Sequence, residues 1–417
     1  MSGARQLLVT IFNSSIHRKE KALHNLATLI RFSLFPGVFL VSSLLTTNSS
    51  FSAENANRYR SHYKAALLAD AESGRILRHD RMHQKIYPAS LVKMMVALIT
   101  LEEIKSGRIS LQDHVKVSRW ASKIGGHQVY LKQGEVFQLA ELMKATVISS
   151  ANDAAVAVAE HVYGSDKIFI KKMNERALQL GMRKTHFYSV HGLPPGRGQE
   201  LDVSSAYDLY LLALELLKHP QYLHWSSTRI DSFRNGTFQL LNTNHRLIRN
   251  YRGMEGMKTG YHRRAGFNLV STAKRERQRF ISVVLGATNS RWRSKTTKHL
   301  LNYGFNNYLK YELNKKGDSV PFSAKVDGGK VEDVSLQVAE SVSILLSREE
   351  RKRLKILPQI PSQTGAPVDA GQQLGRLEYW LDGKILKQVT LQSDSAVPAQ
   401  SILPGLTGML TKMSDIN

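Results

Sequence analysis

Apolar residues along the chain are spaced as strands first, then as helices, then as strands again. Residues 65–79 form two apolar runs around the turn Ala71-Glu72-Ser73-Gly74, and residues 266–287 repeat this arrangement around a charged turn, so both predict hairpins. Residues 91–104 are apolar almost all round, which is typical of a buried helix. Residues 138–217 carry mostly helical spacing. This order predicts an α+β domain whose first and last strands share one antiparallel sheet.

The pattern changes at about residue 318, where short alternating runs and the turns Asp327-Gly328-Gly329 and Asp382-Gly383 begin. These features predict a small all-β domain over residues 318–396. Because 417 residues exceed one average domain, we expect two domains, 54–317 and 318–396, followed by a frayed C-terminal tail at 397–417.

The N-terminus has the pattern of an export signal. An apolar run of about 14 residues, 32–45, precedes a small and polar stretch and follows four basic residues, Arg18, Lys19, Lys21 and Arg31. This length suits a signal peptide and is short for a membrane span. We expect residues 1–53 to be a signal peptide or an N-terminal anchor. The protein would then be exported to the periplasm or the outer face of the cytoplasmic membrane.

The positive charge is concentrated in the central part of the chain. Of the formal net charge of +24, residues 1–53 carry +4 and residues 321–417 carry none, which leaves +20 in residues 54–320. Such a region is attracted to anionic membrane lipid or wall polymer, although an ordinary solvated basic surface is an equal alternative. The chain has no zinc finger, no aromatic RNA-binding signature and no glycine-rich phosphate loop, so nucleic acid is the weakest candidate partner.

Residue usage narrows the possible chemistry. The chain has no cysteine, which excludes disulfides, thiolate zinc sites and a cysteine nucleophile. None of its 15 histidines lies in a clustered metal-ligand spacing. We therefore expect no metal and no cofactor.

Three short motifs carry the strongest chemical signal. They are Ser90-Leu91-Val92-Lys93, Ser150-Ala151-Asn152 and Lys258-Thr259-Gly260. A serine hydroxyl is a weak nucleophile until a base removes its proton. Ser90 begins the predicted buried helix, where its own N–H can point at a developing oxyanion, and Lys93 lies one turn further on the same face. Burial and the second cation Lys258 would lower the Lys93 pKa enough for it to act as that base.

The second motif lies where one helical pattern stops and another begins. An N-cap or a turn would explain it equally well by itself. In the functional interpretation, the Ser150 hydroxyl lies between Lys93 and Lys258 and relays a proton to the leaving amine, while the Asn152 amide binds substrate backbone. We expect Asp153 to cap the following helix.

The third motif precedes a β-rich run, so its strand edge can pair with an extended peptide. Lys258 and Thr259 would hold an anionic terminal carboxylate, and Gly260 would let the ligand approach the backbone closely. The motif is common in isolation and gains meaning only beside the other two.

As a set, these motifs resemble those of the low-molecular-mass penicillin-binding proteins, the serine-type D-alanyl-D-alanine carboxypeptidases. The resemblance covers residues 62–396 and includes His191-Gly192-Leu193, Ala206-Tyr207-Asp208 and the later string Gly371-Gln372-Gln373-Leu374-Gly375. It implies a penicillin-binding, β-lactamase-like catalytic domain followed by the family's small β domain. It also implies removal of the terminal D-alanine of peptidoglycan pentapeptide through a Ser90 acyl-enzyme that penicillins and other β-lactams trap.

The resemblance also implies an arginine near the substrate carboxylate. In two features the chain departs from the family's pattern. The arginine is Arg293, with Arg291 as the alternative. Many relatives have histidine directly after the third motif, where this chain has Tyr261 and then His262, which could change rate or substrate preference. Relatives often end in an amphipathic anchoring helix, and the tail here is short and interrupted.

Other functions share the motifs. A D,D-endopeptidase that cuts peptidoglycan cross-links would usually lack the second domain, and a wall-binding module would not need an intact set of catalytic residues. A serine β-lactamase typically uses a glutamate in Glu-x-x-Leu-Asn, and the nearest string here, residues 175–179, falls within a predicted helix. The carboxypeptidase is the favoured prediction, and the endopeptidase and the wall-binding module are its alternatives.

Overall fold

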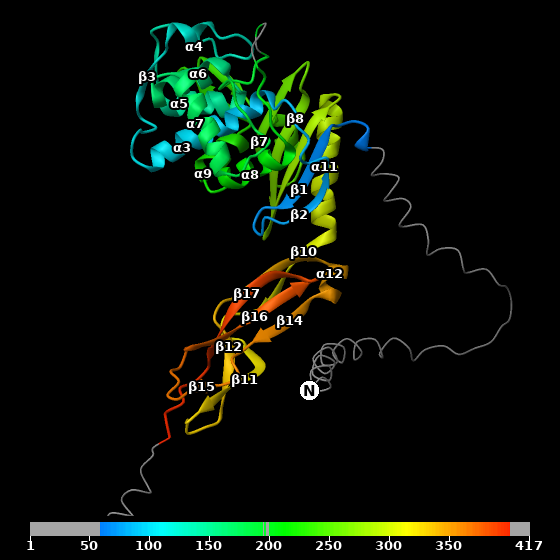
Figure 1. Cartoon of the computed structure of the whole chain (residues 1–417). Coiled ribbons are helices and arrows are strands. Elements are labelled where there is room, and N and C mark those ends of the chain that lie inside the picture. Colours follow the sequence, from blue (N-terminus) through cyan, green and yellow to red (C-terminus); the bar gives the residue numbers. More distant parts are fainter. Residues whose placement is uncertain (1–58, 195, 197–199, 401–417) are drawn as a thin grey trace, which may run out of the picture. The chain divides into compact units, whose positions relative to one another are not determined.

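The computed structural model describes residues 59–194, 196 and 200–400. A five-stranded antiparallel sheet forms the centre of its N-terminal part (Figure 1). Its strand order is β2-β1-β9-β8-β7. The strands are β1 (Ala65–Asp70), β2 (Ile76–Asp80), β7 (Met254–His262), β8 (Gly266–Arg275) and β9 (Gln278–Ala287). Ala65 of β1 pairs with Leu285 of β9. The predicted shared sheet is therefore confirmed.

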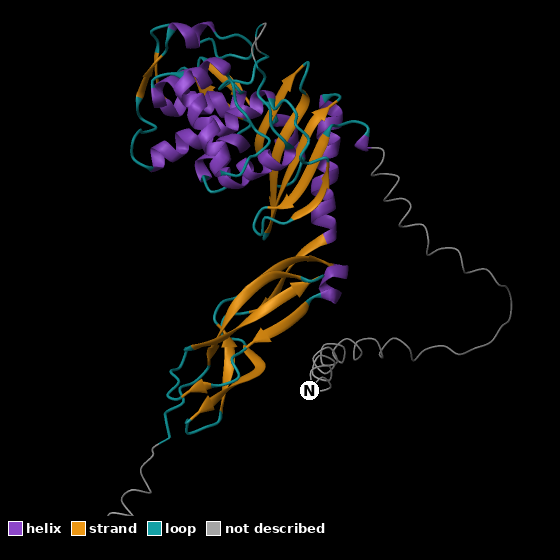
Figure 2. Ribbon diagram, viewed as in Figure 1, coloured by secondary structure: helices purple, strands orange, loops and turns teal. Residues whose placement is uncertain are grey.

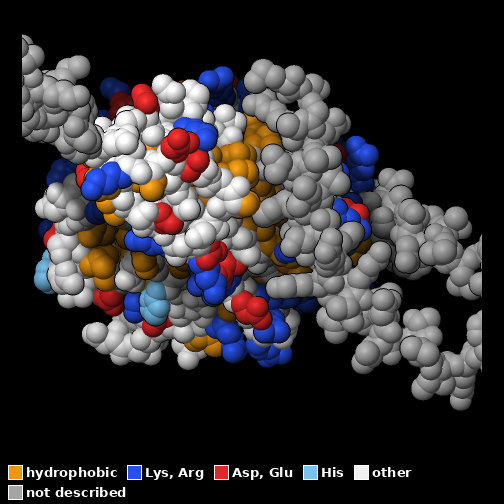
Figure 3. Space-filling view, turned by 90° about the horizontal axis from the view of Figure 1, so that it is seen from below, with side chains coloured by type: hydrophobic (Ala, Val, Ile, Leu, Met, Phe, Trp, Pro, Cys, Tyr) orange, Lys and Arg blue, Asp and Glu red, His pale blue; other side chains and the backbone are white. Residues whose placement is uncertain are grey.

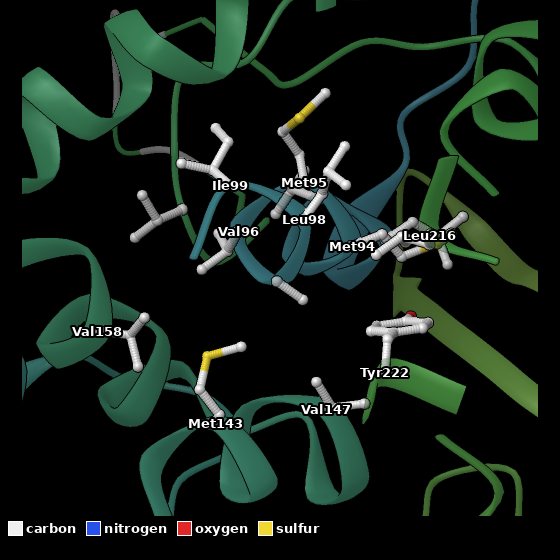
Figure 4. Packing of buried hydrophobic residues seen from close by; sticks show 14 of the residues in the cluster. Met94, Met95, Val96, Leu98, Ile99, Met143, Val147, Val158, Leu216 and Tyr222 are labelled. Atoms are coloured by element: carbon white, nitrogen blue, oxygen red, sulfur yellow. The ribbon is translucent and has the colours of Figure 1, made fainter. Parts of the chain in front are cut away.

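Helices cover both faces of this sheet (Figure 2). One face carries η1 (Ala89–Val92), α3 (Lys93–Lys105), α5 (Leu139–Lys144), η2 (Ala145–Ser149), α6 (Asn152–Tyr163), α7 (Asp166–Gln179), α8 (Ala206–Leu216) and α9 (Pro220–Ser227). The predicted buried helix is confirmed, because every residue of α3 from Lys93 to Leu101 is buried. Figure 4 shows its apolar side chains surrounded by those of neighbouring elements, among them Met143, Val158 and Tyr222. Each such side chain contributes roughly 1.5–3 kcal/mol by leaving water.

The opposite face is covered mainly by α11 (Ser290–Asn307), whose Leu300 and Leu301 pack with Phe280 of β9. Asn289 caps this helix by accepting a hydrogen bond from the Trp292 N–H at 2.9 Å. Short elements complete this part of the chain, namely β3 (His114–Lys116), α4 (Arg119–Lys123), β4 (Val136–Gln138), β5 (Ile230–Phe233), β6 (Phe238–Leu241) and α10 (His245–Asn250).

The C-terminal part is a small β domain with two sheets. Its main sheet has the order β14-β16-β17-β12-β11-β15, and β10 pairs with β13. The elements are β10 (Tyr308–Asn314), β11 (Ser319–Asp327), β12 (Asp333–Val338), β13 (Val342–Ser347), α12 (Arg348–Arg353), β14 (Lys355–Gln359), β15 (Thr364–Gly365), β16 (Gln373–Leu381) and β17 (Lys384–Ser393). The strand pairing of this part begins with β10 at Tyr308, and the predicted domain boundary at 318 stays a prediction.

The charged surface mixes both signs. On the face shown in Figure 3, lysine and arginine side chains lie among aspartate and glutamate. One example of such pairing is Arg176, which lies 2.6 Å from Glu102. The predicted signal segment, residues 1–53, and the tail beyond residue 400 lie outside the described residues. No helix in the described ranges is long and apolar enough to cross a membrane.

Candidate active site

The predicted nucleophile lies on a tight turn at the edge of the helical layer. Ser90 belongs to η1, a 3-10 turn that leads into α3. Ala89 directly before it has φ +52°, in the left-handed region that non-glycine residues seldom adopt. A Cβ atom at Gly260 of β7 would meet the Pro88 carbonyl at 2.5 Å, and one at Gly192 would collide with Ala89. Both glycines are needed for the close approach of their segments to this turn.

Lys93 is buried beside the Ser90 hydroxyl. Its Nζ lies 3.1 Å from Ser90 Oγ, 2.7 Å from Asn152 Oδ1 and 2.7 Å from the His191 carbonyl. The last two oxygens can only accept hydrogen bonds. In its neutral form, Lys93 therefore uses both N–H bonds on them and keeps its lone pair for the serine proton.

The electrostatics favour that neutral form. Only 1% of Lys93 is exposed, and burial, followed by the charge of Lys258, holds its pKa well below the usual range. Asp202 and Asp153 act in the opposite direction but do not outweigh these effects. The predicted lowering of the Lys93 pKa agrees with the structure.

Asp202 fixes the loop that supplies the His191 carbonyl. This aspartate belongs to none of the three motifs and was not predicted as a site residue. Its carboxylate accepts hydrogen bonds from the Tyr188 N–H at 2.7 Å and from the Ser189 hydroxyl at 2.7 Å. The Ser189 hydroxyl in turn accepts from the Gly192 N–H at 2.8 Å. The string His191-Gly192-Leu193 signalled this loop, but nothing in the sequence linked it to Asp202.

Asn152 joins Lys93 to a neighbouring loop. Besides accepting from Lys93, its side chain donates to the Gly125 carbonyl at 2.7 Å, and its backbone N–H donates to the His127 carbonyl at 2.7 Å. One hydrogen of the amide is therefore used within the protein, and the expected bond to substrate would need the other one.

Asp153 is not the N-cap residue of α6, which is Ala151, but its carboxylate accepts a hydrogen bond from the Ala154 N–H in the first turn at 2.9 Å. The expected local bond to the helix start is therefore present, although not from the N-cap position. The buried carboxylate also accepts from the Val129 N–H and from the Leu131 N–H at 3.0 Å. This anchoring of a distant loop is added to the local bond, and nothing in the sequence indicated it.

Ser150 occupies the turn between η2 and α6. It is 5% exposed and has φ +70°, again in the left-handed region. Within the described residues, no hydrogen bond joins its hydroxyl to Lys93 or Lys258. Its expected position between the two lysines therefore stays a prediction.

The third motif lies on β7, which is an edge strand of the sheet. Lys258 is 2% exposed, and burial, followed by the charge of Arg293, lowers its pKa to about 7. Thr259 donates its hydroxyl hydrogen to Thr243 Oγ1 at 2.7 Å. The edge strand therefore carries one buried basic group, Lys258, which feels the charge of a second one, Arg293.

Of the two candidate arginines, Arg293 is the less exposed one. It lies in the first turns of α11, burial lowers its pKa to about 10, and its charge acts on Lys258. Arg291 is exposed. The structure thus brings Arg293, and not Arg291, close to the third motif.

Tyr261 and His262 fall on opposite faces of β7. Tyr261 is 56% exposed and stacks on Phe267 of β8, with 4.1 Å between ring centroids. The His262 Nδ1 accepts a hydrogen bond from the Ala265 N–H at 3.1 Å, which ties this ring to the β7–β8 turn. His262 therefore does not take the place of a histidine directly after the motif.

A cleft of about 360 Å³ lies beside the second and third motifs. Its lining includes Ser149, which precedes Ser150 of the second motif. It also includes Thr243, which accepts the hydrogen bond from Thr259 of the third motif. Its other walls are uncharged amides and apolar groups with two histidines, namely Gly126, His127, Gln128, Tyr130, Phe238, Gln239, Leu241, Asn242 and His245. No group of residues suited to hold a metal ion occurs in the described part of the chain.

Comparisons with known proteins show the family of the chain. A family model described as D-alanyl-D-alanine carboxypeptidase matches residues 51–289, and one described as penicillin-binding protein 5, C-terminal domain, matches residues 308–399. The chain is 33% identical to D-alanyl-D-alanine carboxypeptidase DacF of Bacillus subtilis, over 85% of this chain and 91% of the relative. It is also 33% identical to DacC of Escherichia coli, over 78% and 82%.

Two solved structures are similar to this chain, one over most of its length and one over little more than half. Penicillin binding protein 5 from Haemophilus influenzae superposes with a TM-score of 0.67 at 28% identity, over 81% of this chain and 98% of that one. Penicillin-binding protein D2 from Listeria monocytogenes, solved with bound ampicillin, covers 58% of this chain and 97% of its own at 31% identity, with a TM-score of 0.53. The chain belongs to the serine D-alanyl-D-alanine carboxypeptidases, the low-molecular-mass penicillin-binding proteins.

Proposed function

We propose that Ser90 is the nucleophile of this carboxypeptidase and Lys93 its general base. The observation that carries the proposal is the 3.1 Å separation of Lys93 Nζ and Ser90 Oγ, with the amine buried. A base must lie within hydrogen-bond reach of the proton it takes and must be unprotonated. The lowered pKa of Lys93 meets the second requirement.

In the acylation step, Ser90 Oγ attacks the carbonyl carbon of the scissile peptide while its proton passes to Lys93. The Ser90 N–H, at the start of η1, supports the negative charge that develops on the carbonyl oxygen. Collapse of the tetrahedral intermediate breaks the C–N bond. The departing amine takes a proton that originates on Lys93 and passes through the Ser150 hydroxyl. Water then attacks the Ser90 ester, which releases the shortened peptide and restores the serine.

The substrate is peptidoglycan pentapeptide, which loses its terminal D-alanine. We expect Lys258, Thr259 and Arg293 to hold the terminal carboxylate, because basic groups and a hydroxyl bind a carboxylate through charged hydrogen bonds. The effect of the Arg293 charge on Lys258 supports this assignment. The free edge of β7 lets the extended peptide add as a further strand, with the Asn152 amide binding its backbone and Gly260 allowing close approach. The endopeptidase and wall-binding alternatives have no structural observation in their favour.

β-Lactams are expected to acylate the same serine. The likeness to a Listeria protein solved with bound ampicillin supports this extension. Export of the chain is likewise a proposal, supported by the basic and apolar pattern of residues 1–53. At its destination, the basic catalytic region would favour anionic membrane or wall surfaces.

The test is D-alanine release from diacetyl-lysyl-D-alanyl-D-alanine by the full chain, with a penicillin-treated control. Release that penicillin blocks supports the proposal. Covalent penicillin binding without release would instead favour the endopeptidase or binding alternatives. Ser90→Ala is expected to abolish both labelling and release, and persistence of either would refute the nucleophile assignment.

A further inference from the structure

One buried asparagine ties the sheet to the segment just before the nucleophile. Asn268 of β8 is 0% exposed. Its Nδ2 donates to the Tyr87 carbonyl at 2.9 Å and to the Pro88 carbonyl at 3.1 Å. Its Oδ1 accepts from the Gly286 N–H at 2.7 Å. Both amide hydrogens and the oxygen are thus used on backbone groups.

The position of Asn268 in the sheet explains why its side chain is available for these bonds. The pairing of β8 with β9 shifts register between Phe267 and Leu269, on either side of Asn268. The Gly286 N–H bonds to the asparagine side chain at this irregularity. A break in the ladder therefore directs one side chain of β8 toward the catalytic turn.

The two carbonyls that Asn268 holds lie immediately before a strained residue. Pro88 is the N-cap of η1, and its carbonyl also accepts from the Leu91 N–H at 3.3 Å. Ala89, which follows, has φ +52°. A non-glycine residue keeps such a conformation only where its surroundings enforce it. Asn268 supplies this restraint two residues before Ser90, with Gly260 packed closely against the same turn.

We propose that Asn268 is a positioning residue for acylation, which holds the Tyr87–Ser90 turn so that the Ser90 hydroxyl faces Lys93. This inference rests on the proposed role of Ser90 as nucleophile. Asn268 contacts neither substrate nor reacting atoms, and it acts only through the backbone of the turn.

The sharpest variant is Asn268→Asp, which keeps the shape of the side chain and the bond from Gly286 but directs an oxygen at two carbonyl oxygens. Asn268→Ala removes the donors without this repulsion. The matched control is Thr272→Val on the same strand, because Thr272 is also 0% exposed and donates to a backbone carbonyl, that of Phe280, at 3.0 Å. Thr272 makes no contact with the catalytic turn through this bond.

The measurement is the acylation of the full chain by a fluorescent penicillin, resolved into non-covalent binding and the rate constant at saturation. We expect the saturating rate constant to fall about 100-fold in Asn268→Asp and about 10-fold in Asn268→Ala, because misplacing a reacting group by about 1 Å can cost 10²-fold. Non-covalent binding is expected to stay within about threefold. Thr272→Val should lower the melting temperature while its acylation rate stays within about twofold.

Acylation by folded Asn268→Asp within about threefold of the parent chain would overturn the proposal. If that variant does not fold, Asn268→Ala decides by the same criterion. An equal loss of rate in Thr272→Val would also overturn it, because the effect would then follow general destabilisation. Labelling of Ser90→Ala would refute the proposed nucleophile itself, whereas a silent Ser90→Ala beside a fully active Asn268→Asp would refute the positioning role alone.

Discussion

The catalytic part and the small β domain both bury ionisable groups, but they treat them differently. In the catalytic part, burial and the charge of Lys258 lower the pKa of Lys93. Burial and the charge of Arg293 lower the pKa of Lys258. In the β domain, burial raises the pKa of Glu378, but hydrogen bonds from Arg376, Trp380 and Gln388 outweigh it and bring the pKa below its usual value.

This difference separates reactive from inert buried charge. Glu378 is fully bonded and stays ionised, so it has no proton to exchange near neutral pH. Lys93 is held where its charged form is unfavourable, which is the condition a general base needs. Burial alone therefore does not identify a functional ionisable group. Burial close to a group of the same charge is a better indicator.

The largest expected effect is the loss of the base. Lys93→Met should lower the rate of D-alanine release by about 10³-fold or more, because general-base catalysis contributes about 10²–10⁴-fold. The control is Lys218→Met, since that side chain is 68% exposed and pairs with Glu215 on the surface. Both variants are compared with the parent chain by steady-state turnover and by penicillin labelling. A tenfold loss or less in Lys93→Met would place the base elsewhere.

The pH dependence should come next in size. In its proposed role, Lys258 attracts the terminal carboxylate while it is protonated, and this charge is lost as pH rises above its pKa of about 7. For a substrate that ends in a carboxylate, kcat/KM is therefore expected to fall as pH rises above about 7, by up to about tenfold per pH unit. The check is a profile measured beside one for a substrate amidated at its terminus. An identical alkaline fall for the amide would assign it to another group.

Variants of Arg293 and Arg291 test whether carboxylate binding depends on the position of the arginine. Arg293→Gln should raise KM about tenfold, because a charged hydrogen bond to a carboxylate is worth about 1.5–3 kcal/mol and tenfold corresponds to about 1.4 kcal/mol. Arg291→Gln removes an exposed charge at the start of the same helix and should change KM less than twofold. Equal effects of both variants would show that general attraction, and not a specific contact, binds the carboxylate.

The smallest effect on activity should come from the β domain. Glu378→Gln keeps the volume of the side chain but removes the charge that three donors share. We expect the free energy of unfolding to fall by about 1–2 kcal/mol and kcat/KM to stay within twofold. Denaturant unfolding and turnover check this. A marked loss of turnover would contradict the separation between inert and reactive buried charge.

The sequence predicted the parts of the fold that local patterns specify. The hairpins, the buried helix α3 and the strands of the small β domain follow from spacing of apolar residues within each element. The three motifs located most of the candidate site for the same reason, since Ser90 and Lys93 are one helical turn apart.

Contacts between segments that lie far apart in the sequence were not predicted. Asp153 was expected to bond only to the start of its own helix, but it also anchors a loop more than 20 residues earlier, at Val129 and Leu131. Asn268 lies 180 residues from the Pro88 carbonyl to which it donates. The pairing of β10 with β13 likewise cannot be read from the residues of β10 alone. Nothing in local composition marks such partners.

The pairing of Ala65 with Leu285 also bears on how the chain folds. The turn that carries Ser90 is held by Gly260 and Asn268, from strands that join the sheet only after most of the catalytic part has been synthesised. Pairings between such distant segments form slowly, since the entropy of closing long loops opposes them. Reactivity toward penicillin should accordingly be among the last properties a refolding chain regains, which makes covalent labelling a clock for the final stage of folding.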